Sequence, residues 1–511
     1  MNLVEMLDRQ ARKFAAKEAL RAQGYTVTFA ELKDIAERMA AVLQAQGIGP
    51  GDTVALMSQN TPDFVFAFFG AQKAGAAVVP VNHKLAPPEV DYILNHSNAR
   101  IFLFDASLAS VAEALSSSVP MVSMDAAVPN RPFWRDLVSA APNFTPVSVE
   151  DEATAEILYT SGTTGKPKGC VLTHRSVVMA AITGALALKM DENDRLLMAM
   201  PIWHSSPLNN WFLGAFYVGA TTILLREYHP LHFLQTVQQE RCTVYFGAPV
   251  SYLLPLQMIP NFDDFDLSSM RAWIYGGGPI APETVRLLQE RYKSDRFYQV
   301  YGMTEAGPTG TMLPPEAHAL KAGSIGNKSL PGTDLVVMKS ETEQAGPGEA
   351  GEIWLKADSM MRGYLNDPEA TQKAFYNGWY RTGDVARIDD DGYLFIVDRL
   401  KDMIITGGEN VYSKEVEDAL AEHPHVAQAA VIGTAHPDWG ETVTAIIVPA
   451  KGTTPTAADL TAFLQTRLAK YKIPRIYHFV DALPHTPTGK VMKYKLREMF
   501  SLRKENSCSN G

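Results

Sequence analysis

The N-terminal part of the chain alternates apolar and polar positions with a helical period. The segment TFAELKDIAERMAAVLQAQG begins with Thr28 and Glu31, which have the spacing of a capping box. Apolar residues then recur every three or four positions as far as Leu43, and Gly47 closes the pattern. The pattern therefore predicts an amphipathic helix between Thr28 and Gly47.

Short apolar runs that are typical of buried strands alternate with helical stretches along most of the chain. The run DTVALMS is followed by the helical stretch TPDFVFAFFGAQKAG and then by the run AAVVPVN. Similar runs recur as IFLFD, TTILL, CTVYFGAP and RAWIYGGG, without a fixed repeat length. Helices that alternate with buried strands predict an α/β fold, with helices layered on mixed or parallel sheets.

The character of the chain changes near Asp398. There the sequence DRLKDMIITGGENVYSKEVEDAL passes from charged residues through a Gly-Gly loop to a helix that starts at Ser413. The pattern then predicts two strands, a helix and a strand, in a segment of roughly 110 residues, a common domain size. We therefore predict a large N-terminal region of α/β subdomains over residues 1–398 and a small α+β domain over residues 399–511.

Length and charge limit the classes of protein. A chain of 511 residues exceeds what one hydrophobic core usually accommodates, which agrees with at least two domains. The net charge is −10, from 46 basic and 56 acidic residues. Sequence-independent binding of nucleic acid needs a basic surface, so nucleic acid is not a predicted partner. A polyphosphate ligand must be held by local donors rather than by the overall charge.

The cysteines and apolar runs indicate the compartment. Cys170, Cys242 and Cys508 are far apart, so we expect neither a disulfide framework nor a structural zinc site. The N-terminus carries acids from Glu5 onward and lacks the apolar core of a signal peptide. The longest uncharged apolar run, Trp211–Leu225, has 15 residues, whereas a spanning helix needs about 20. We predict a cytoplasmic protein without a transmembrane segment and leave a homodimer open.

The stretch YTSGTTGKPKG, from Tyr159 to Gly169, has the composition of a phosphate-binding loop. Its glycines permit a close approach of the backbone, and successive amides in such a turn form an anion cradle. Four Ser and Thr hydroxyls add donors, and Lys166 and Lys168 add charge. Taken alone, the stretch is also compatible with a flexible surface hairpin. It is not a Walker A loop, because two residues rather than four separate its first glycines.

Five further strings follow this loop. They are YGGGPI (Tyr275–Ile280), VYGMTEAG (Val300–Gly307), GWYRTGD (Gly378–Asp384), DRLKDMIITGGENVY (Asp398–Tyr412) and PTGKVMK (Pro487–Lys493). Together with the loop, they resemble in order and spacing the signatures of the adenylate-forming superfamily: acyl- and aryl-CoA synthetases, nonribosomal peptide adenylation domains and firefly-type luciferases. The resemblance covers essentially the whole chain, and implies a mobile C-terminal domain joined at a hinge.

The resemblance implies a two-step acyl transfer with ATP, Mg²⁺ and coenzyme A. Attack of a carboxylate on the α-phosphate of ATP gives an acyl-AMP and pyrophosphate, and a thiol then displaces AMP. The first step brings together two anions, so Mg²⁺, a lysine and oriented amides must offset their repulsion. The acidic net charge makes these local cations more necessary.

The resemblance also implies roles for individual residues. The β- and γ-phosphates are expected at Thr160, Ser161, Gly162, Thr163, Thr164, Gly165 and Lys168. The adenine is expected beside Gly276, Gly277 and Gly278, with Tyr301 stacked on it, and the nucleotide-binding set also includes Gly302 and Met303. Thr304 corresponds to the hydroxyl at the α-phosphate, and Glu305 to the Mg²⁺ ligand. Asp384 and Arg399 correspond to the ribose contacts.

The small domain is expected to serve both half-reactions. Lys490 corresponds to the lysine that bridges the substrate carboxylate and the α-phosphate. Rotation at Lys401 would then turn the loop with Gly407 and Gly408 toward the site and form a thiol channel. Trp439 corresponds to an aromatic beside the nucleotide of coenzyme A, although a packing tryptophan is an equally good interpretation.

The segment MPIWHSSPLNNWF resembles one wall of the acyl pocket. His204 corresponds to a gate near the carboxylate and completes the predicted catalytic set with Lys490, Thr304 and Glu305; a core histidine is the alternative. No Asp occurs from 200 to 212, which disfavours an amino-acid substrate. A fatty or related aliphatic acid is predicted. The polar residues of the segment leave open an aryl acid of the benzoate or coumarate type.

Three further alternatives concern the acceptor or the class of protein. The acyl-AMP could be delivered to an acceptor other than coenzyme A. An oxygenase of the luciferase kind also stays open, because it would need no sequence motif beyond those already described. A non-catalytic nucleotide-binding regulator would be expected to lose Lys490 or Glu305, and the chain retains both.

Overall fold

The computed structural model describes residues 1–22, 24–160, 167–277, 280–400, 402–406, 409–436, 440–468, 470–485 and 491–501, with the backbone alone at 399, 409, 410, 440 and 501. The described chain divides into two compact units. The first contains Met1–Leu335 and Leu355–Tyr380, and the second contains Val336–Trp354 and Arg381–Gly511. The boundary that we expected between residues 398 and 399 stays a prediction.

The first unit contains a seven-stranded sheet that carries the predicted phosphate loop. Its strands, in spatial order, are β17 (Gly363–Tyr364), β8 (Lys168–Thr173), β7 (Thr154–Thr160), β4 (Ala77–Val81), β3 (Thr53–Met57), β5 (Ile101–Phe104) and β6 (Met121–Ser123). Strands β7, β4, β3, β5 and β6 are parallel, and β8 and β17 are antiparallel to their neighbours. The sheet is therefore mixed, with an antiparallel edge next to the loop.

An eight-stranded sheet follows in the same unit. Its strands, in spatial order, are β14 (Gly310–Leu313), β13 (Phe297–Gly302), β12 (Ala272–Gly276), β11 (Val244–Gly247), β9 (Arg195–Met198), β10 (Thr221–Leu224), β1 (Glu18–Ala22) and β2 (Tyr25–Thr28). All neighbouring pairs from β13 to β1 are parallel. The expected α/β fold with parallel and mixed sheets is confirmed.

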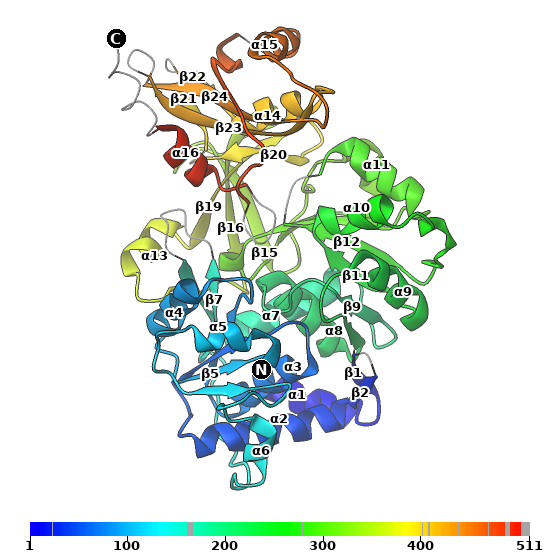
Figure 1. Cartoon of the computed structure of the whole chain (residues 1–511), viewed down its shortest axis with the longest axis vertical. Helices are drawn as coiled ribbons and strands as arrows, with labels where there is room; N and C mark the ends of the chain where they lie inside the picture. Colours follow the sequence, from blue (N-terminus) through cyan, green and yellow to red (C-terminus); the bar gives the residue numbers. More distant parts are fainter. Residues whose placement is uncertain are drawn as a thin grey trace. The chain divides into compact units, whose positions relative to one another are not determined.

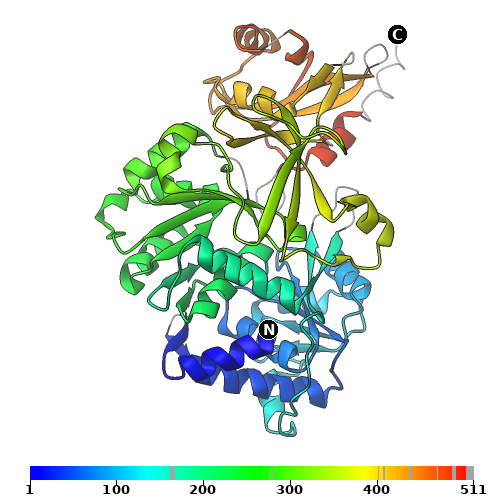
Figure 2. The same cartoon turned by 180° about the vertical axis from the view of Figure 1, so that it is seen from behind.

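Helices cover both sheets of the first unit. They are α1 (Leu3–Lys13), α2 (Phe29–Ala45), α3 (Pro62–Lys73), α4 (Pro87–His96), α5 (Ala109–Glu113), α6 (Trp134–Val138), α7 (His174–Ala187), α8 (Leu213–Val218), α9 (Pro230–Glu240), α10 (Pro249–Met258), α11 (Pro282–Arg291), α12 (His318–Lys321) and α13 (Pro368–Ala374). The predicted capping box is present at α2, because Thr28 and Glu31 each accept a hydrogen bond from the other's backbone N–H. Figure 1 shows α9 and α10 beside β11, and Figure 2 shows α1 next to α2.

The parallel strands are buried on both faces. Val54 and Leu56 of β3 belong to a core that also contains Leu196 of the other sheet, whereas Ala55 and Met57 face a second core. This double burial explains why these strands appear in the sequence as unbroken apolar runs. The shared core holds the two sheets of the first unit together.

The second unit contains the small α+β domain that the sequence predicted. Its sheet has the order β22 (Glu409–Val411), β21 (Ile404–Thr406), β24 (Gly440–Pro449) and β23 (Val426–His436), and β25 (Ile476–Phe479) pairs with β24. Its helices are α14 (Ser413–Ala421), α15 (Ala457–Gln465) and α16 (Lys493–Ser501). A further five-stranded sheet takes residues from both units and has the order β15 (Thr333–Met338), β16 (Ala350–Ala357), β19 (Trp379–Ile388) and β18 (Phe375–Tyr376), with β20 (Leu394–Arg399) beside β19.

Membrane insertion finds no support among the helices. In the part of the chain that the structure describes, every helix is too short or too polar to cross a bilayer. Residence in the cytoplasm stays a prediction.

Candidate active site

The flanks of the phosphate loop are fixed by side chains of α4. Thr160 at the end of β7 pairs with Lys168 at the start of β8, so the hairpin brings both ends of the loop together. The hydroxyl of Tyr159 lies 2.8 Å from Nδ1 of His96, and the hydroxyl of Tyr92 donates to the carbonyl of Pro167 at 3.2 Å. The predicted contacts Ser161, Gly162, Thr163, Thr164 and Gly165 lie outside the described residues. The structure nevertheless describes the two residues that flank this segment, Thr160 and Pro167.

A chain of contacts joins the loop to the predicted metal ligand. The side chain of Glu305 is buried, and its Oε1 accepts a hydrogen bond of 3.0 Å from the hydroxyl of Tyr364. On the same ring, the Nζ of Lys168 lies 4.8 Å from the centroid, within range of a cation–π interaction. Burial and the nearby charge of Glu305 raise the pKa of Tyr364, so its hydroxyl keeps the proton that it donates.

Tyr364 was not among the residues that the sequence singled out. It lies in the string MRGYLND, between two of the recognised motifs. Strand β17 places it opposite Cys170 of β8, next to the loop. Only the pairing of β17 with β8 brings it to Glu305, which is 59 positions away, so no local sequence pattern could have found it.

The predicted α-phosphate contact Thr304 lies in a tightly fixed turn. Thr304–Ala306 form one turn of 3-10 helix, and Gly307 follows with a φ of 70°. A Cβ at Gly307 would clash with the carbonyl of Ser359, so glycine is required there. The Oγ1 of Thr304 lies 2.8 Å from the Oγ of Ser205, which belongs to the predicted wall of the acyl pocket.

Within the predicted wall, Ser206–Phe212 form a π-helix, a geometry that is often found at functional sites. The indole N–H of Trp211 donates to the Oγ of Ser206 at 3.1 Å. The amide of Asn209 donates to the Oε2 of Glu156 at 3.0 Å. Helix α7 packs against this wall at Gly184, where a Cβ would clash with the backbone of the π-helix. The predicted gate, His204, is partly buried just before this π-helix, and its ring lies 5.6 Å from that of Trp203.

Glu156 is a second functional candidate that the sequence reasoning missed. It is completely buried on β7, and burial raises its pKa from 4.5 to about 8, although the amide of Asn209 acts in the opposite direction. The available signal was a single acidic residue inside the apolar run ATAEILYT. A carboxyl at such a position is unusual without a cation beside it.

The glycine-rich end of β12 lies next to the predicted adenine contact. Gly276 pairs with Val300 of β13, and a Cβ there would come within 2.7 Å of the Val300 carbonyl. The next glycine, Gly277, has a φ of 74°, and Tyr301 is partly exposed beside them on β13. Gly302 is equally restricted, because a Cβ would come within 2.6 Å of the carbonyl of Pro308. Met303 is partly buried, and Gly278 lies outside the described residues.

Comparison with known proteins identifies the family. The model of the AMP-binding enzyme family matches residues 7–365, and that of the AMP-binding enzyme C-terminal domain matches residues 415–490. This chain belongs to the AMP-binding enzyme family. The predicted membership of the adenylate-forming superfamily, among the acyl-CoA synthetases, is confirmed.

The similarity to individual members of the family extends over almost the whole chain. A feruloyl-CoA synthase of Amycolatopsis sp is 38% identical over 500 residues, 96% of this chain and 98% of the relative. The long-chain-fatty-acid–CoA ligase FadD13 of Mycobacterium tuberculosis is 38% identical over 476 residues, 93% of each chain. The crystal structure of ATP-bound MatB from Rhodopseudomonas palustris is similar with a TM-score of 0.87 at 31% identity, covering 98% of this chain and 100% of that chain.

The remaining site residues of this family member lie in the second unit. Asp384 is buried on β19, where its backbone N–H donates to the Oγ1 of Thr382 at 3.0 Å. It pairs across the sheet with Arg399 of β20, so the two predicted ribose contacts are cross-strand neighbours. Lys401, Gly407, Gly408, Trp439 and Lys490 lie outside the described residues. Their roles stay predictions.

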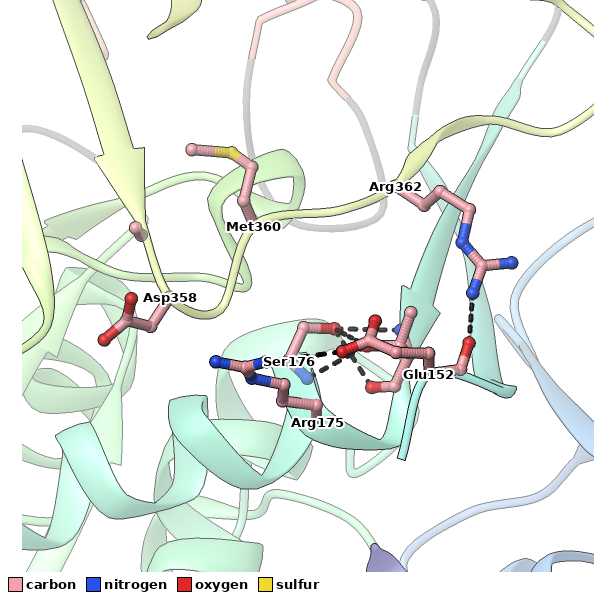
Figure 3. Close-up of a pocket in the computed structure, with 8 residues that line it drawn as sticks. Glu152, Arg175, Ser176, Asp358, Met360 and Arg362 are labelled. Atoms are coloured by element: carbon pink, nitrogen blue, oxygen red, sulfur yellow. Dashed lines mark hydrogen bonds and ion pairs between the residues drawn. The ribbon is translucent and has the colours of Figure 1, made fainter. Parts of the chain in front are cut away.

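A separate pocket at the start of α7 contains none of the motif residues (Figure 3). It is lined by Glu152, Arg175, Asp358 and Arg362, among others. Arg175 forms an exposed ion pair of 3.5 Å with Glu152, and Arg362 donates to the Glu152 carbonyl. Exposed pairs of this kind contribute little, so the pocket adds no candidate to the site.

Proposed function

We propose that this chain is an ATP-dependent carboxylic acid–CoA ligase that works through an acyl-AMP. In the first half-reaction, a carboxylate oxygen bonds to the α-phosphorus of ATP and pyrophosphate leaves. In the second, the sulfur of coenzyme A bonds to the acyl carbon, AMP leaves with the electron pair, and the thiol proton passes to solvent. The observation that carries the proposal is the contact chain Lys168–Tyr364–Glu305, next to the Thr304–Ser205 pair.

Glu305 fits the role of a Mg²⁺ ligand. It is a buried carboxylate with one oxygen held by Tyr364, and a hard oxygen donor suits a hard cation. Mg²⁺ commonly takes one or two carboxylates together with substrate phosphates and water, so one protein carboxylate is sufficient. This agrees with the finding that the described residues form no cluster of three or more metal-ligating side chains. When bound, Mg²⁺ would neutralise charge on the phosphate oxygens.

The described residues of the first unit support a division of labour around the nucleotide. Lys168 and the backbone at Thr160 would meet the terminal phosphates, and their pairing across the hairpin supports this role. Thr304 would offer its hydroxyl to the α-phosphate, and its contact with Ser205 supports a meeting of the two reacting groups there. Tyr301 and the glycines of β12 would receive the adenine.

The second unit would complete the site in turn. Lys490 would bridge the two anions during adenylation, and Asp384 would accept the ribose hydroxyls. The loop with Gly407 and Gly408 would face the site after rotation at Lys401, with Trp439 beside coenzyme A. A fixed domain could not present both surfaces, which is why a hinge is part of the proposal.

A fatty or related aliphatic acid is the first candidate substrate. Leu208, Trp211 and Phe212 are buried residues of the wall and belong to one apolar core, which suits an acid with an apolar body. The similarity to the fatty-acid ligase named above supports the same class.

An aryl acid is the second candidate. The rings of Trp211 and Phe246 lie 5.6 Å apart with an interplanar angle of 28°, an offset arrangement that favours a flat aromatic neighbour. The similarity to a feruloyl-CoA synthase supports it as well.

The proposal is tested with exchange of labelled pyrophosphate into ATP over a panel of fatty and aryl acids, with and without coenzyme A. Acid-dependent exchange that needs Mg²⁺, followed by thioester formation when coenzyme A is added, is the expected result. Acid-dependent exchange without any thioester would instead indicate delivery of the acyl-AMP to another acceptor. Absence of exchange with every acid would refute adenylation itself.

A further inference from the structure

Two segments extend inward from the phosphate end of the first unit and meet at one hydrogen bond. Along β7, Glu156 shares a face with Thr160, and the four intervening steps cover about 13 Å at about 3.3 Å per residue. Along the wall, Asn209 lies about one turn beyond Ser205, which is bonded to Thr304. The amide of Asn209 donates to the Oε2 of Glu156 at 3.0 Å. This pair therefore lies about one turn along the wall from Ser205, the residue that contacts Thr304.

The pair contains buried oxygens that lack hydrogen-bond partners. Neither Glu156 nor Asn209 is exposed to solvent. Within the described residues, the Oε1 of Glu156 and the Oδ1 of Asn209 have no partner. Most buried polar atoms in proteins are paired, so two unpaired oxygens from adjoining side chains require an explanation.

The chemistry of the pair defines what would complete it. Burial keeps the carboxyl of Glu156 largely protonated at neutral pH, because its pKa is raised to about 8. Its Oε2 accepts from Asn209, so an Oε1–H would be a donor, while the Oδ1 of Asn209 is an acceptor. A substrate hydroxyl group accepts one hydrogen bond and donates another, so it can satisfy both atoms.

We propose that Glu156 and Asn209 form a subsite for a hydroxyl at the end of the acid opposite its carboxylate, and that the substrate is a hydroxylated aryl acid. The surroundings fit an apolar body, because Leu158, Leu208 and Trp211 belong to the same buried core. The stacked Trp211 and Phe246 favour a ring rather than a flexible chain. This inference rests on the proposed function, since it names the substrate class of that same site. A buried water, or a reciprocal acid–amide pair, is the competing explanation.

The test compares matched acids that differ by one hydroxyl. We would measure kcat/KM for acid-dependent pyrophosphate exchange with cinnamate and 4-hydroxycinnamate, and with octanoate and 8-hydroxyoctanoate. The wild-type protein is expected to prefer 4-hydroxycinnamate over cinnamate by roughly 100-fold, because the unhydroxylated acid leaves buried polar atoms unpaired. The aliphatic pair shows whether a chain can place its hydroxyl equally well; a larger preference there than in the aryl pair would refute the aryl assignment.

Three variants separate recognition from folding. Glu156→Leu is expected to reduce the preference to near unity and to raise kcat/KM for cinnamate, and Glu156→Gln, which keeps the shape, should retain part of the preference. Gln10→Leu is the matched control, because Gln10 of α1 is also buried with an unpaired Oε1, and its amide bonds the carbonyl of Tyr217 rather than Glu156 or Asn209. It should destabilise the protein and leave the preference unchanged. Thermal unfolding would verify that each variant is folded.

The outcomes distinguish this inference from the ligase assignment. Exchange with both cinnamates at similar kcat/KM in the wild-type protein would overturn the subsite and leave adenylation standing, as would a preference that survives in both Glu156 variants. In that case water alone would bond to the unpaired oxygens of Glu156 and Asn209. Failure to exchange with any acid would overturn the proposed function and the subsite with it.

Discussion

The hydroxyl of Tyr364 should tune the affinity of the site for Mg²⁺. Tyr364→Phe removes the oxygen that donates to Glu305 at 3.0 Å and leaves the ring in place under Lys168. A hydrogen bond to a charged group contributes about 1.5–3 kcal/mol. Since about 1.4 kcal/mol corresponds to a factor of ten, the affinity for Mg·ATP should fall roughly 10- to 100-fold.

The assay is a titration of Mg²⁺ at fixed ATP and saturating acid, read by pyrophosphate exchange. The variant should need more Mg²⁺ for half-maximal exchange and should approach the wild-type rate when Mg²⁺ is high. Calorimetric titration of Mg²⁺ with a non-hydrolysable ATP analogue supplies a second measurement that does not depend on turnover. Tyr292→Phe is the control, because it also removes a buried phenol hydrogen bond, of 2.9 Å to the Tyr252 carbonyl, at a remote position.

A loss of activity that is the same at every Mg²⁺ concentration would refute the reasoning. It would mean that Tyr364 supports the loop or the fold rather than the position of Glu305. A shift in Mg²⁺ dependence that Tyr292→Phe reproduces would refute it as well.

Other predictions address the hinge, the lysine and two buried groups. Lys490→Ala should abolish pyrophosphate exchange while thioester formation from supplied acyl-AMP is largely retained; equal loss in both assays would contradict its assigned role. Lys401→Pro, which fixes φ, should do the reverse, and its single-turnover acyl-AMP yield should match the wild type. The raised pKa of Glu156 means that the native state keeps a proton that the unfolded chain loses. The free energy of unfolding should therefore fall as pH rises from about 4.5 to about 8, with a slope of at most about 1.4 kcal/mol per pH unit. Urea unfolding of Glu156→Gln should lack this slope. Burial lowers the pKa of His174 from 6.5 to about 4, so stability should also fall as pH drops through that window, and His174→Gln should be insensitive there by the same measurement.

The sequence predicted the secondary structure well where local rules determine it. The capping box at Thr28 and Glu31 and the doubly buried run at β3 are both encoded within a few residues. The order of motifs was equally informative, because six strings in one order identify a family without any knowledge of tertiary contacts. The residues that these strings contain, such as Thr304 and Glu305, were therefore available before the structure.

The sequence could not supply the contacts that support those residues. Tyr364 reaches Glu305 only because β17 pairs with β8, and His96 reaches Tyr159 from a helix 63 positions earlier. Neither Tyr364 nor His96 stands in a local sequence pattern that distinguishes it from an ordinary surface aromatic residue. From the sequence, the hydroxyls and amides of the predicted acyl wall left open an aryl acid, and nothing in the pattern indicated their burial. The structure buries Ser205, Asn209 and Asn210 instead of exposing them.

Two of the buried carboxyls of the first unit, Glu305 and Glu156, have contrasting surroundings. Glu305 accepts a hydrogen bond from the phenol of Tyr364, and the ring of that phenol also contacts the ammonium of Lys168. Among the described residues, the hydrogen bond that lowers the pKa of Glu156 comes from the amide of Asn209, and burial outweighs it and raises that pKa to about 8. A charged oxygen is what a Mg²⁺ ligand needs, and a neutral acid is what a hydroxyl acceptor needs. In the two proposals, the β7–β8 hairpin connects Lys168, at the anionic end of the reaction, with a subsite that must stay uncharged, so exchanging the two environments should abolish both proposed functions.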